Sequence, residues 1–355
     1  MRRIEISNCE PGMILGKAIF NGNLTLLESG ALLTKSYIER LKDLGITEVY
    51  IEDEISKDLV IHDVVEESTR QEAVAFIKES MDNYASMEFL NSAEAIELVN
   101  KILDEILTME DILVNLIDIK LRDMYTYSHC VNVCILSIIT GLKLNLSLDE
   151  LKELGVGALL HDIGKIMIPQ EILLKKAALS SREYEVIKEH SFHGYNILKK
   201  LPLISEASAR VALEHHERFD GKGYPNGLQN DKIHIYSRIV AITDIFDSLT
   251  SDRIYRKKIS VNTAIEYLTV IASPTLDAQV LNCFIQFIPP YPVGTGVILN
   301  NGEKGVVIGI NKNYPTRPVI RVVFNSDGSK KTFYEEINLS ERRDYTIMNN
   351  AELVR

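Results

Sequence analysis

Cysteine is scarce in this chain of 355 residues, and its four copies are scattered with no Cys-x-x-Cys pair. A disulfide framework, or a zinc site built from thiolates, needs cysteines at close and regular spacing. The sequence therefore argues against both and suits a reducing compartment. We expect the thiols to be small buried side chains. They belong to Cys9, Cys130, Cys134 and Cys283.

Long apolar runs are missing as well. Eighteen consecutive apolar residues, the length of a membrane helix, occur nowhere, and the first residues lack the apolar segment of a signal peptide. With 46% hydrophobic and 25% charged residues, the composition is that of a soluble chain with room for two or three domains. We expect a cytoplasmic protein that does not bind a membrane.

Positive charge is in deficit, because 39 lysines and arginines face 50 acidic residues and give a formal net charge of −11. Proteins that bind DNA, RNA or anionic membrane surfaces are usually basic, so none of these is expected as a partner. Any phosphate-bearing ligand must instead be held by a few local cations.

Histidine is concentrated, with six of the eight copies between positions 129 and 216. His161 and Asp162 stand side by side at the end of an apolar helical run, which a capping box of Ser147 and Glu150 opens. Near a helix end, neighbouring side chains can both reach one small ion. The pair alone is weak evidence for a metal, because a buried histidine that donates to an aspartate is also common.

Two other histidines face the expected core. His129 begins the apolar face of the preceding helix, and His190 belongs to the apolar stripe of a later helix that Ser180 and Glu183 cap. His193 lies about 60° away from that stripe, so it is interpreted as a flanking residue.

The last candidates follow further along the chain. His215 and His216 end the next helix, over residues 204–216, and Asp244 stands in the middle of an apolar helix. A buried carboxylate without a partner is costly, so Asp244 is expected to face a metal ion or a cation.

These positions together resemble the HD superfamily of metal-dependent phosphohydrolases, whose pattern is His, then His-Asp, then Asp. The stretch 216–228, which contains Gly223-Tyr224-Pro225, resembles the HD-GYP subfamily, in which bacterial cyclic di-GMP phosphodiesterases are found. The resemblance covers about residues 118–290. It implies a mainly α fold, in which an all-helical HD-type phosphohydrolase core is joined to a small N-terminal α/β module and a small C-terminal β module.

Imidazole and carboxylate ligands without thiolates suit two divalent transition-metal ions, with iron or manganese favoured and zinc, cobalt or nickel as alternatives. Asp162 is the expected bridge. No third ion is expected, because Tyr125 stands where three-metal members carry a glutamate, and Asp247 is expected to support a ligating histidine. One ion is assigned to His129, His161, Asp162 and Asp244, and the other to Asp162, His190, His215 and His216, with the division of the second set left open.

The substrate phosphates need cations. Asp162 and Lys165 are the expected catalytic residues, and Lys165 is also expected to contact substrate. Arg253 and Arg256 match a basic stretch that the family uses for the dinucleotide, although surface salt bridges would explain them too. The loop Gly223-Tyr224-Pro225 is a further substrate-contact candidate, with a tight positioning turn and a partner contact as open alternatives.

Four regions are expected along the chain. Residues 1–65 form a small accessory or regulatory module, with a helix over 35–44, a strand over 48–52 and a hairpin around Ser29-Gly30. Residues 66–117 form a helical connector through which the chain could form a homodimer. Residues 118–290 form the phosphodiesterase domain. Residues 291–355 form a small β extension with strands at 296–299, 304–310, 319–324 and 331–334.

The resemblance implies hydrolysis of cyclic di-GMP to pGpG, and on to GMP as an open alternative. A second class of function is a weakly catalytic nucleotide sensor that recruits GGDEF-domain or other signalling partners. A third is a phosphodiesterase for another cyclic dinucleotide. The complete set of expected ligands favours the enzyme, because a degenerate sensor would be expected to have lost at least one of them.

Overall fold

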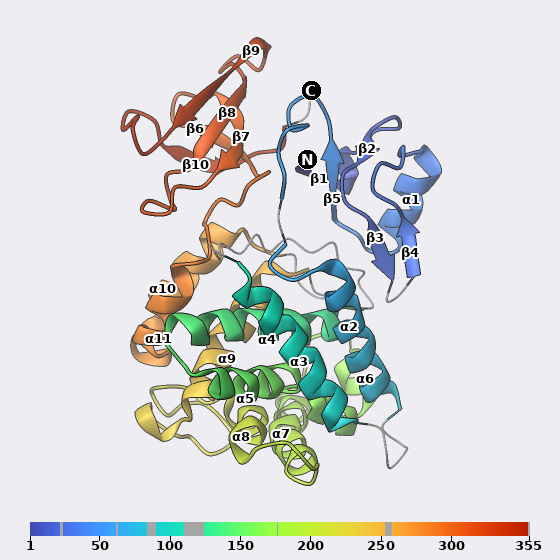
Figure 1. Cartoon of the computed structure of the whole chain (residues 1–355), viewed down its shortest axis with the longest axis vertical. Helices are drawn as coiled ribbons and strands as arrows, with labels where there is room; N and C mark the ends of the chain where they lie inside the picture. Colours follow the sequence, from blue (N-terminus) through green and yellow to red (C-terminus); the bar gives the residue numbers. More distant parts are fainter. Residues whose placement is uncertain are drawn as a thin grey trace.

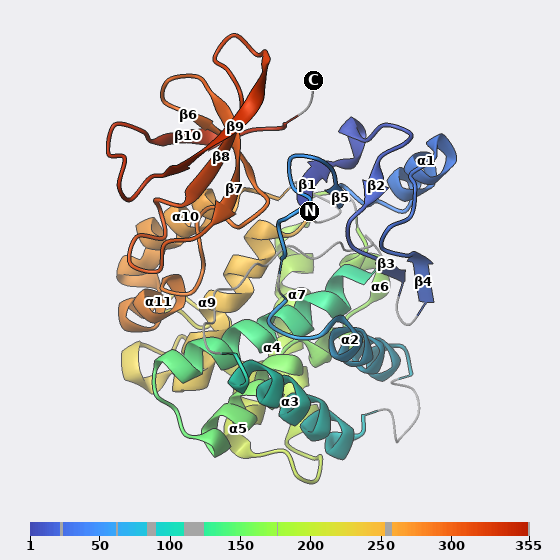
Figure 2. The same ribbon diagram turned by 45° about the horizontal axis from the view of Figure 1, so that its top comes forward.

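A computed structural model describes residues 1–21, 24–61, 63–83, 90–109, 124–175, 177–252 and 258–353, with the backbone alone at Tyr125. The chain is mainly helical, as predicted. A body of helices carries two β-rich modules on one side, one from each end of the chain (Figures 1 and 2). No helix within these ranges combines the length and the apolar character that crossing a membrane requires.

The helical body is built around α4 (Tyr125–Lys143), whose residues from Cys130 to Gly141 are buried on all sides. A helix that is apolar all round belongs in a core, and α4 packs against α5, α9 and α2. The other helices are α2 (Glu67–Asp82), α3 (Ser92–Leu107), α5 (Leu148–Leu159), α6 (Gln170–Leu173), α7 (Ser181–Leu198), α8 (Glu206–Glu214), α9 (Ile235–Thr250), α10 (Val261–Thr275) and α11 (Ala278–Ile285).

The capping signals in the sequence are confirmed. The hydroxyl of Ser147 accepts the N–H of Glu150, whose carboxylate accepts the N–H of Ser147, and Ser180 forms the same box with Glu183 at the start of α7. These boxes begin the two helices that lead to His161 and His190.

The expected ends of two helices were too late by two to three residues. Leu159 is the last residue of α5, and His161 and Asp162 lie in the turn before a 3-10 helix, Ile163–Met167. The chain leaves the α-helical path there as Gly164 packs directly onto the backbone of α7. Likewise α8 ends at Glu214, so that His215 caps the helix and His216 follows it.

The N-terminal module contains the predicted helix and strand, as α1 (Lys35–Asp43) and β5 (Glu48–Glu52). A three-stranded antiparallel sheet has the order β1 (Arg2–Glu5), β5, β2 (Ile14–Leu15). The hairpin predicted around Ser29-Gly30 is wrong. The paired strands are β3 (Ile19–Asn21) and β4 (Leu24–Leu27), and the turn at Gly30 returns the chain toward β2 instead, where Leu15 donates its N–H to Ala31.

The C-terminal module is one antiparallel sheet of order β10-β6-β7-β8-β9. Three strands match the prediction, namely β6 (Gly296–Leu299), β7 (Lys304–Gly309) and β8 (Val319–Phe324). The strand β9 (Lys330–Asn338) is longer than predicted, and β10 (Ile347–Asn350) was missed because most of its side chains are exposed and leave no apolar alternation.

Both modules are tied to their surroundings by polar contacts. Arg321 on β8 donates to both carboxylate oxygens of Asp58 at 2.6 Å each. Thr47 of the N-terminal module donates to Asp252, beyond α9, at 2.6 Å. The buried faces of α2 and α3 pack within the chain, against α4 and α5. The predicted region boundaries and the predicted homodimer stay predictions.

Candidate metal centre

Seven side chains converge in the helical body, and they are the seven predicted as metal ligands. They come from the start of α4, the turns after α5 and α8, and the middles of α7 and α9. His216 is partly exposed, and the other six are buried. The set is His129, His161, Asp162, His190, His215, His216 and Asp244.

Asp162 lies at the centre of this cluster. Its Oδ2 is 3.4 Å from Nε2 of His161 and 3.9 Å from Nε2 of His129. Its Oδ1 is 3.5 Å from Nε2 of His190 and 3.9 Å from Nε2 of His215. The two carboxylate oxygens therefore face different pairs of histidines.

Asp244 supplies the second buried carboxylate. Its Oδ1 is 3.1 Å from Nε2 of His129, and its Oδ2 is 4.0 Å from Nδ1 of His216. Ser248, one turn further along α9, donates to Oδ1 at 3.2 Å. Asp244 is therefore placed between histidines of both groups, with one oxygen toward each.

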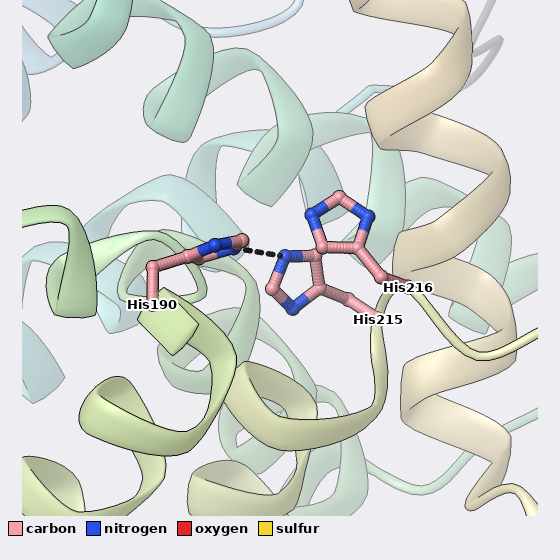
Figure 3. Close-up of side chains that lie close together, drawn as sticks. All are labelled: His190, His215 and His216. Carbon is pink, nitrogen blue, oxygen red and sulfur yellow. Dashed lines mark hydrogen bonds between the residues drawn. The ribbon is translucent and has the colours of Figure 1, made fainter. Parts of the chain in front are cut away.

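The two histidines that face Oδ1 of Asp162, His190 and His215, form a compact group of three with His216 (Figure 3). Nε2 of His190 lies 3.3 Å from Nε2 of His215, and the rings of His215 and His216 are 4.0 Å apart between centroids. One candidate ligand atom from each of the three lies within 4.8 Å of the others. His129, His161 and Asp162 satisfy the same condition as a second group.

Backbone carbonyls orient three of these rings. In each case Nδ1 lies at hydrogen-bonding distance from a carbonyl oxygen one turn earlier in the chain, so Nδ1 carries the proton and Nε2 presents its lone pair. The acceptors are Ala158 for His161 at 2.7 Å, Ile187 for His190 at 2.6 Å, and Val211 and Ala212 for His215 at 3.0 Å each.

His161 shows that these residues fit a metal ion. Among the residues that the structure describes, its Nε2 is a buried polar atom without a hydrogen-bond partner. Such an atom is costly unless a ligand satisfies it. Two ligands bonded to one ion at about 2.1 Å are roughly 3 to 4.2 Å apart, and the oxygen–nitrogen distances around Asp162 lie between 3.4 and 3.9 Å.

Metal binding requires neutral imidazoles and ionised carboxylates, and the pKa directions of three histidines and of Asp162 suit it. Burial lowers the pKa of His190 and His215, and it lowers the pKa of His216 to about 3. Burial alone would raise the pKa of Asp162, but the nearby positive charge of Lys165 favours the ionised form, and that pKa lies well below its usual value. At His129 the effect of burial is outweighed by hydrogen bonds to Asp244 and Asp247, which raise the pKa of that imidazole.

Lys165 lies beside the centre. Its Nζ is 2.5 Å from Oδ2 of Asp162, and its side chain is partly exposed. Lys165, the predicted phosphate contact, is thus close enough to reach a ligand bound at the cluster. In the structure its charge is paired with that of Asp162.

A second layer of polar side chains surrounds His129. Nδ1 of His129 lies 2.7 Å from Oδ2 of Asp247, as expected for a carboxylate that supports this histidine. Asn132 donates to Oδ1 of Asp247 at 2.7 Å. Sequence reasoning missed Asn132, although its position three residues after His129 places both on one helix face.

The Gly-Tyr-Pro loop is pinned beside His216. A side chain on Gly223 would put its Cβ 2.3 Å from the backbone nitrogen of Arg218, so glycine is required there by the tight turn itself. The buried carboxylate of Glu217, which sequence reasoning missed, accepts the N–H groups of Asn226 at 2.7 Å and Leu228 at 3.0 Å. These contacts favour the positioning alternative for Gly223.

Tyr224 of this loop faces the cluster. Its ring lies 4.8 Å from the ring of His216. Nζ of Lys188 on α7 lies 5.5 Å from the Tyr224 ring and 5.3 Å from that of Tyr184. A cation close to two aromatic rings beside the histidines was not predicted, because the sequence shows only the spacing of Tyr184 and Lys188.

Some expectations lie outside the described residues, namely the roles of Arg253 and Arg256 and of the Tyr125 side chain. His193 lies on the flank as predicted, with Nε2 3.7 Å from a carboxylate oxygen of Glu189. Cys9, Cys130 and Cys134 are buried as expected, and Cys283 is partly buried.

Two family models match the chain. Residues 111–280 match an HD domain, and residues 296–352 match a KOW domain associated with the HD domain. Of the eight described α-helices that follow α3, the HD match covers seven in full and the first three residues of the last, α11, and it includes every member of the cluster.

The curated proteins that resemble the chain include three phosphodiesterases of cyclic dinucleotides. A cyclic di-GMP phosphodiesterase of Pseudomonas aeruginosa is 35% identical over 67% of this chain and 57% of its own length. A cyclic di-GMP phosphodiesterase of Thermotoga maritima is 35% identical over 53% of this chain and 53% of its own length. A 3'3'-cGAMP-specific phosphodiesterase of Vibrio cholerae is 34% identical over 52% of this chain and 42% of its own length. The chain thus spans about half the length of these relatives.

Proposed function

We propose that this chain, whose residues 111–280 match an HD domain, is a metal-dependent phosphodiesterase that hydrolyses cyclic di-GMP to the linear dinucleotide pGpG. Curated relatives from Pseudomonas and Thermotoga carry the name cyclic di-GMP phosphodiesterase. The Gly-Tyr-Pro loop beside the cluster supports the same assignment.

The observation that carries the proposal is the position of Asp162. One buried carboxylate turns each of its oxygens to a different pair of imidazole nitrogens, at 3.4 to 3.9 Å. This is the arrangement expected of a carboxylate that bridges two ions. We assign His129, His161, Asp162 and Asp244 to one ion, and Asp162, His190, His215 and His216 to the other.

Two divalent ions held there, with iron or manganese favoured over zinc, cobalt or nickel, would activate water and stabilise the charge that develops on a phosphoryl group. The chain's own residues do the rest. Asp162 and Asp244 bring negative charge into the centre, so a substrate with two phosphates needs cations beside it. Lys165 is placed to contact the phosphate under attack, with Arg253 and Arg256 proposed for the remainder of the dinucleotide.

The aromatic side chains beside the centre suit the bases of such a substrate. Tyr184 is 49% exposed, and Nζ of Lys188 lies close to both its ring and that of Tyr224. Purines stack on aromatic rings with a favourable energy of about 1 to 3 kcal/mol per base. Within the loop, Tyr224 is the proposed base contact, and Gly223 and Pro225 hold it in place.

The test is product analysis of purified, metal-loaded protein given cyclic di-GMP, 3'3'-cGAMP or a nucleoside monophosphate in separate reactions. We expect consumption of cyclic di-GMP with pGpG as the product. A protein with a full metal complement that binds cyclic di-GMP and releases no product would contradict the proposal and favour a sensor that recruits GGDEF-domain or other signalling partners.

A second candidate is hydrolysis of another cyclic dinucleotide. It is favoured by the Vibrio relative, whose name specifies 3'3'-cGAMP. Faster turnover of 3'3'-cGAMP than of cyclic di-GMP in the same assay would support it. The two substrates differ in one base, and stacking on Tyr184 or Tyr224 would accept either base, so the assay itself decides between them.

Replacing Lys165 by alanine should weaken catalysis while metal content stays unchanged. The loss of a cation from a desolvated charge pair costs about 2 to 5 kcal/mol, which corresponds to a reduction of about 30- to 5,000-fold in kcat/KM. Steady-state kinetics and metal analysis of the same sample check this. Lys199→Ala is the control, because that lysine is exposed just after the end of α7 and donates to the hydroxyl of Tyr195. Loss of metal from Lys165→Ala would instead make Lys165 a metal ligand.

A further inference from the structure

The polar contacts behind His129 extend beyond the region that matches the HD domain. Arg70 belongs to α2, more than one helix before residue 111, where that match begins. Its guanidinium donates a hydrogen bond to Oδ1 of Asn132. Asn132 donates to Asp247, and Asp247 accepts from His129, each at 2.7 Å. Three successive hydrogen bonds thus connect Arg70 on α2 to His129, a proposed metal ligand.

All four side chains of this hydrogen-bonded series are buried. The exposed fractions are 8% for Arg70, 2% for Asn132, 4% for Asp247 and 2% for His129. A buried guanidinium is costly unless it is hydrogen-bonded and paired with opposite charge. The burial of Arg70 is therefore favourable only because polar groups of the protein accept its hydrogen bonds.

The direction of the hydrogen bonds is set at Arg70. A guanidinium can only donate, so the carbonyl oxygen of the Asn132 amide must face it and the amide NH₂ must face Asp247. The Asp247 carboxylate only accepts, so it receives N–H donors from Asn132 on one oxygen and from His129 on the other. With its proton on Nδ1, His129 turns the lone pair of Nε2 toward Asp162 and Asp244.

We propose that Arg70 is a positioning residue of the metal centre, which fixes the orientation of Asn132 and through it holds Asp247 and His129 ready for one ion. This inference rests on the proposed role of His129 as a ligand. Without Arg70, the carbonyl oxygen of the Asn132 amide loses this donor, so the amide is held less firmly against Asp247. By this proposal the connector helix α2 contributes to metal binding, because it carries Arg70.

The test measures binding of Mn²⁺ alone to metal-free protein, without substrate. Arg70→Met keeps much of the apolar stem and removes the donors. Loss of an outer contact of a metal ligand lowers affinity by about 10- to 100-fold, and we expect about tenfold for the His129 ion and no change for the His190 ion. Arg70→Lys should recover part of the loss. Lys78→Met is the control, since Lys78 lies on the same helix in an exposed pair with Asp82.

A double variant separates positioning from general packing. If Arg70 acts through Asn132, Arg70→Met should lower Mn²⁺ affinity little further once Asn132→Ala is present. An additional tenfold loss in that background would overturn the proposal, as would an affinity of Arg70→Met equal to that of Lys78→Met. If Arg70→Met does not fold, Asn132→Ala and Arg70→Lys carry the test, and an unchanged affinity in both overturns it.

The outcomes also separate this proposal from the proposed function. A wild-type protein that binds two ions and hydrolyses no cyclic dinucleotide refutes the function and leaves the Arg70 measurement meaningful. An active wild type, with Arg70→Met matching the control in metal affinity, refutes the role of Arg70 alone.

Discussion

Asp162→Asn is expected to abolish hydrolysis and to leave fewer than two ions bound per chain, with the fold retained. Each oxygen of Asp162 faces its own pair of histidines. Asparagine has the same shape but no charge, and its NH₂ would point at one of these pairs. One ion would then lose an anionic ligand, and both would lose the bridge. Turnover and bound metal are measured on the same preparation.

The control is Asp231→Asn, which removes an equal charge from a side chain that is 91% exposed. It should bind metal and turn over substrate like the wild type. Circular dichroism of the metal-free proteins shows whether Asp162→Asn is folded. A folded Asp162→Asn protein with a full metal complement and normal turnover would rule out Asp162 as the bridge.

The members of the cluster could be predicted from the sequence because helical periodicity places them. His129 and His190 stand on apolar stripes, and Asp244 interrupts one, so each had to face the core. Cap residues placed the helix starts correctly. The helix ends were placed less well, because the end of α5 coincides with the contact of Gly164 with α7, which no local pattern reports.

Residues that act across long sequence distances were missed for a similar reason. Arg70 and Asn132 are 62 positions apart. From the sequence alone, an arginine in this helix is expected on a solvated face. Glu217 likewise accepts hydrogen bonds from the backbone of Asn226 and Leu228, nine and eleven residues later in the chain. At Ser29-Gly30 the turn was visible, but the partner of the following segment was not. Turn chemistry specifies a reversal and leaves the strand pairing to the tertiary fold.

The contact between Gly164 and α7 gives the second large expected effect. An alanine Cβ at position 164 would lie 1.9 Å from the carbonyl oxygen of His190 and 2.4 Å from the nitrogen of Gly194. Both are backbone atoms inside α7, so no side chain can move aside and the helix itself must shift. Gly164→Ala is expected to lower the free energy of unfolding by about 3 kcal/mol, the upper part of the usual range for overpacking.

The same shift would carry His190 away from Asp162, because the clashing carbonyl is that of His190 itself. We therefore expect Gly164→Ala to weaken the ion assigned to His190, His215 and His216 more than the ion assigned to His129, and to reduce turnover with it. Urea unfolding of the metal-free protein and a Mn²⁺ titration measure the two effects. Gly309→Ala is the matched control, because its Cβ would meet Val319 at 3.7 Å, an ordinary contact. If both variants unfold at the same urea concentration and bind Mn²⁺ equally, the close packing of Gly164 does not hold the two halves of the centre together.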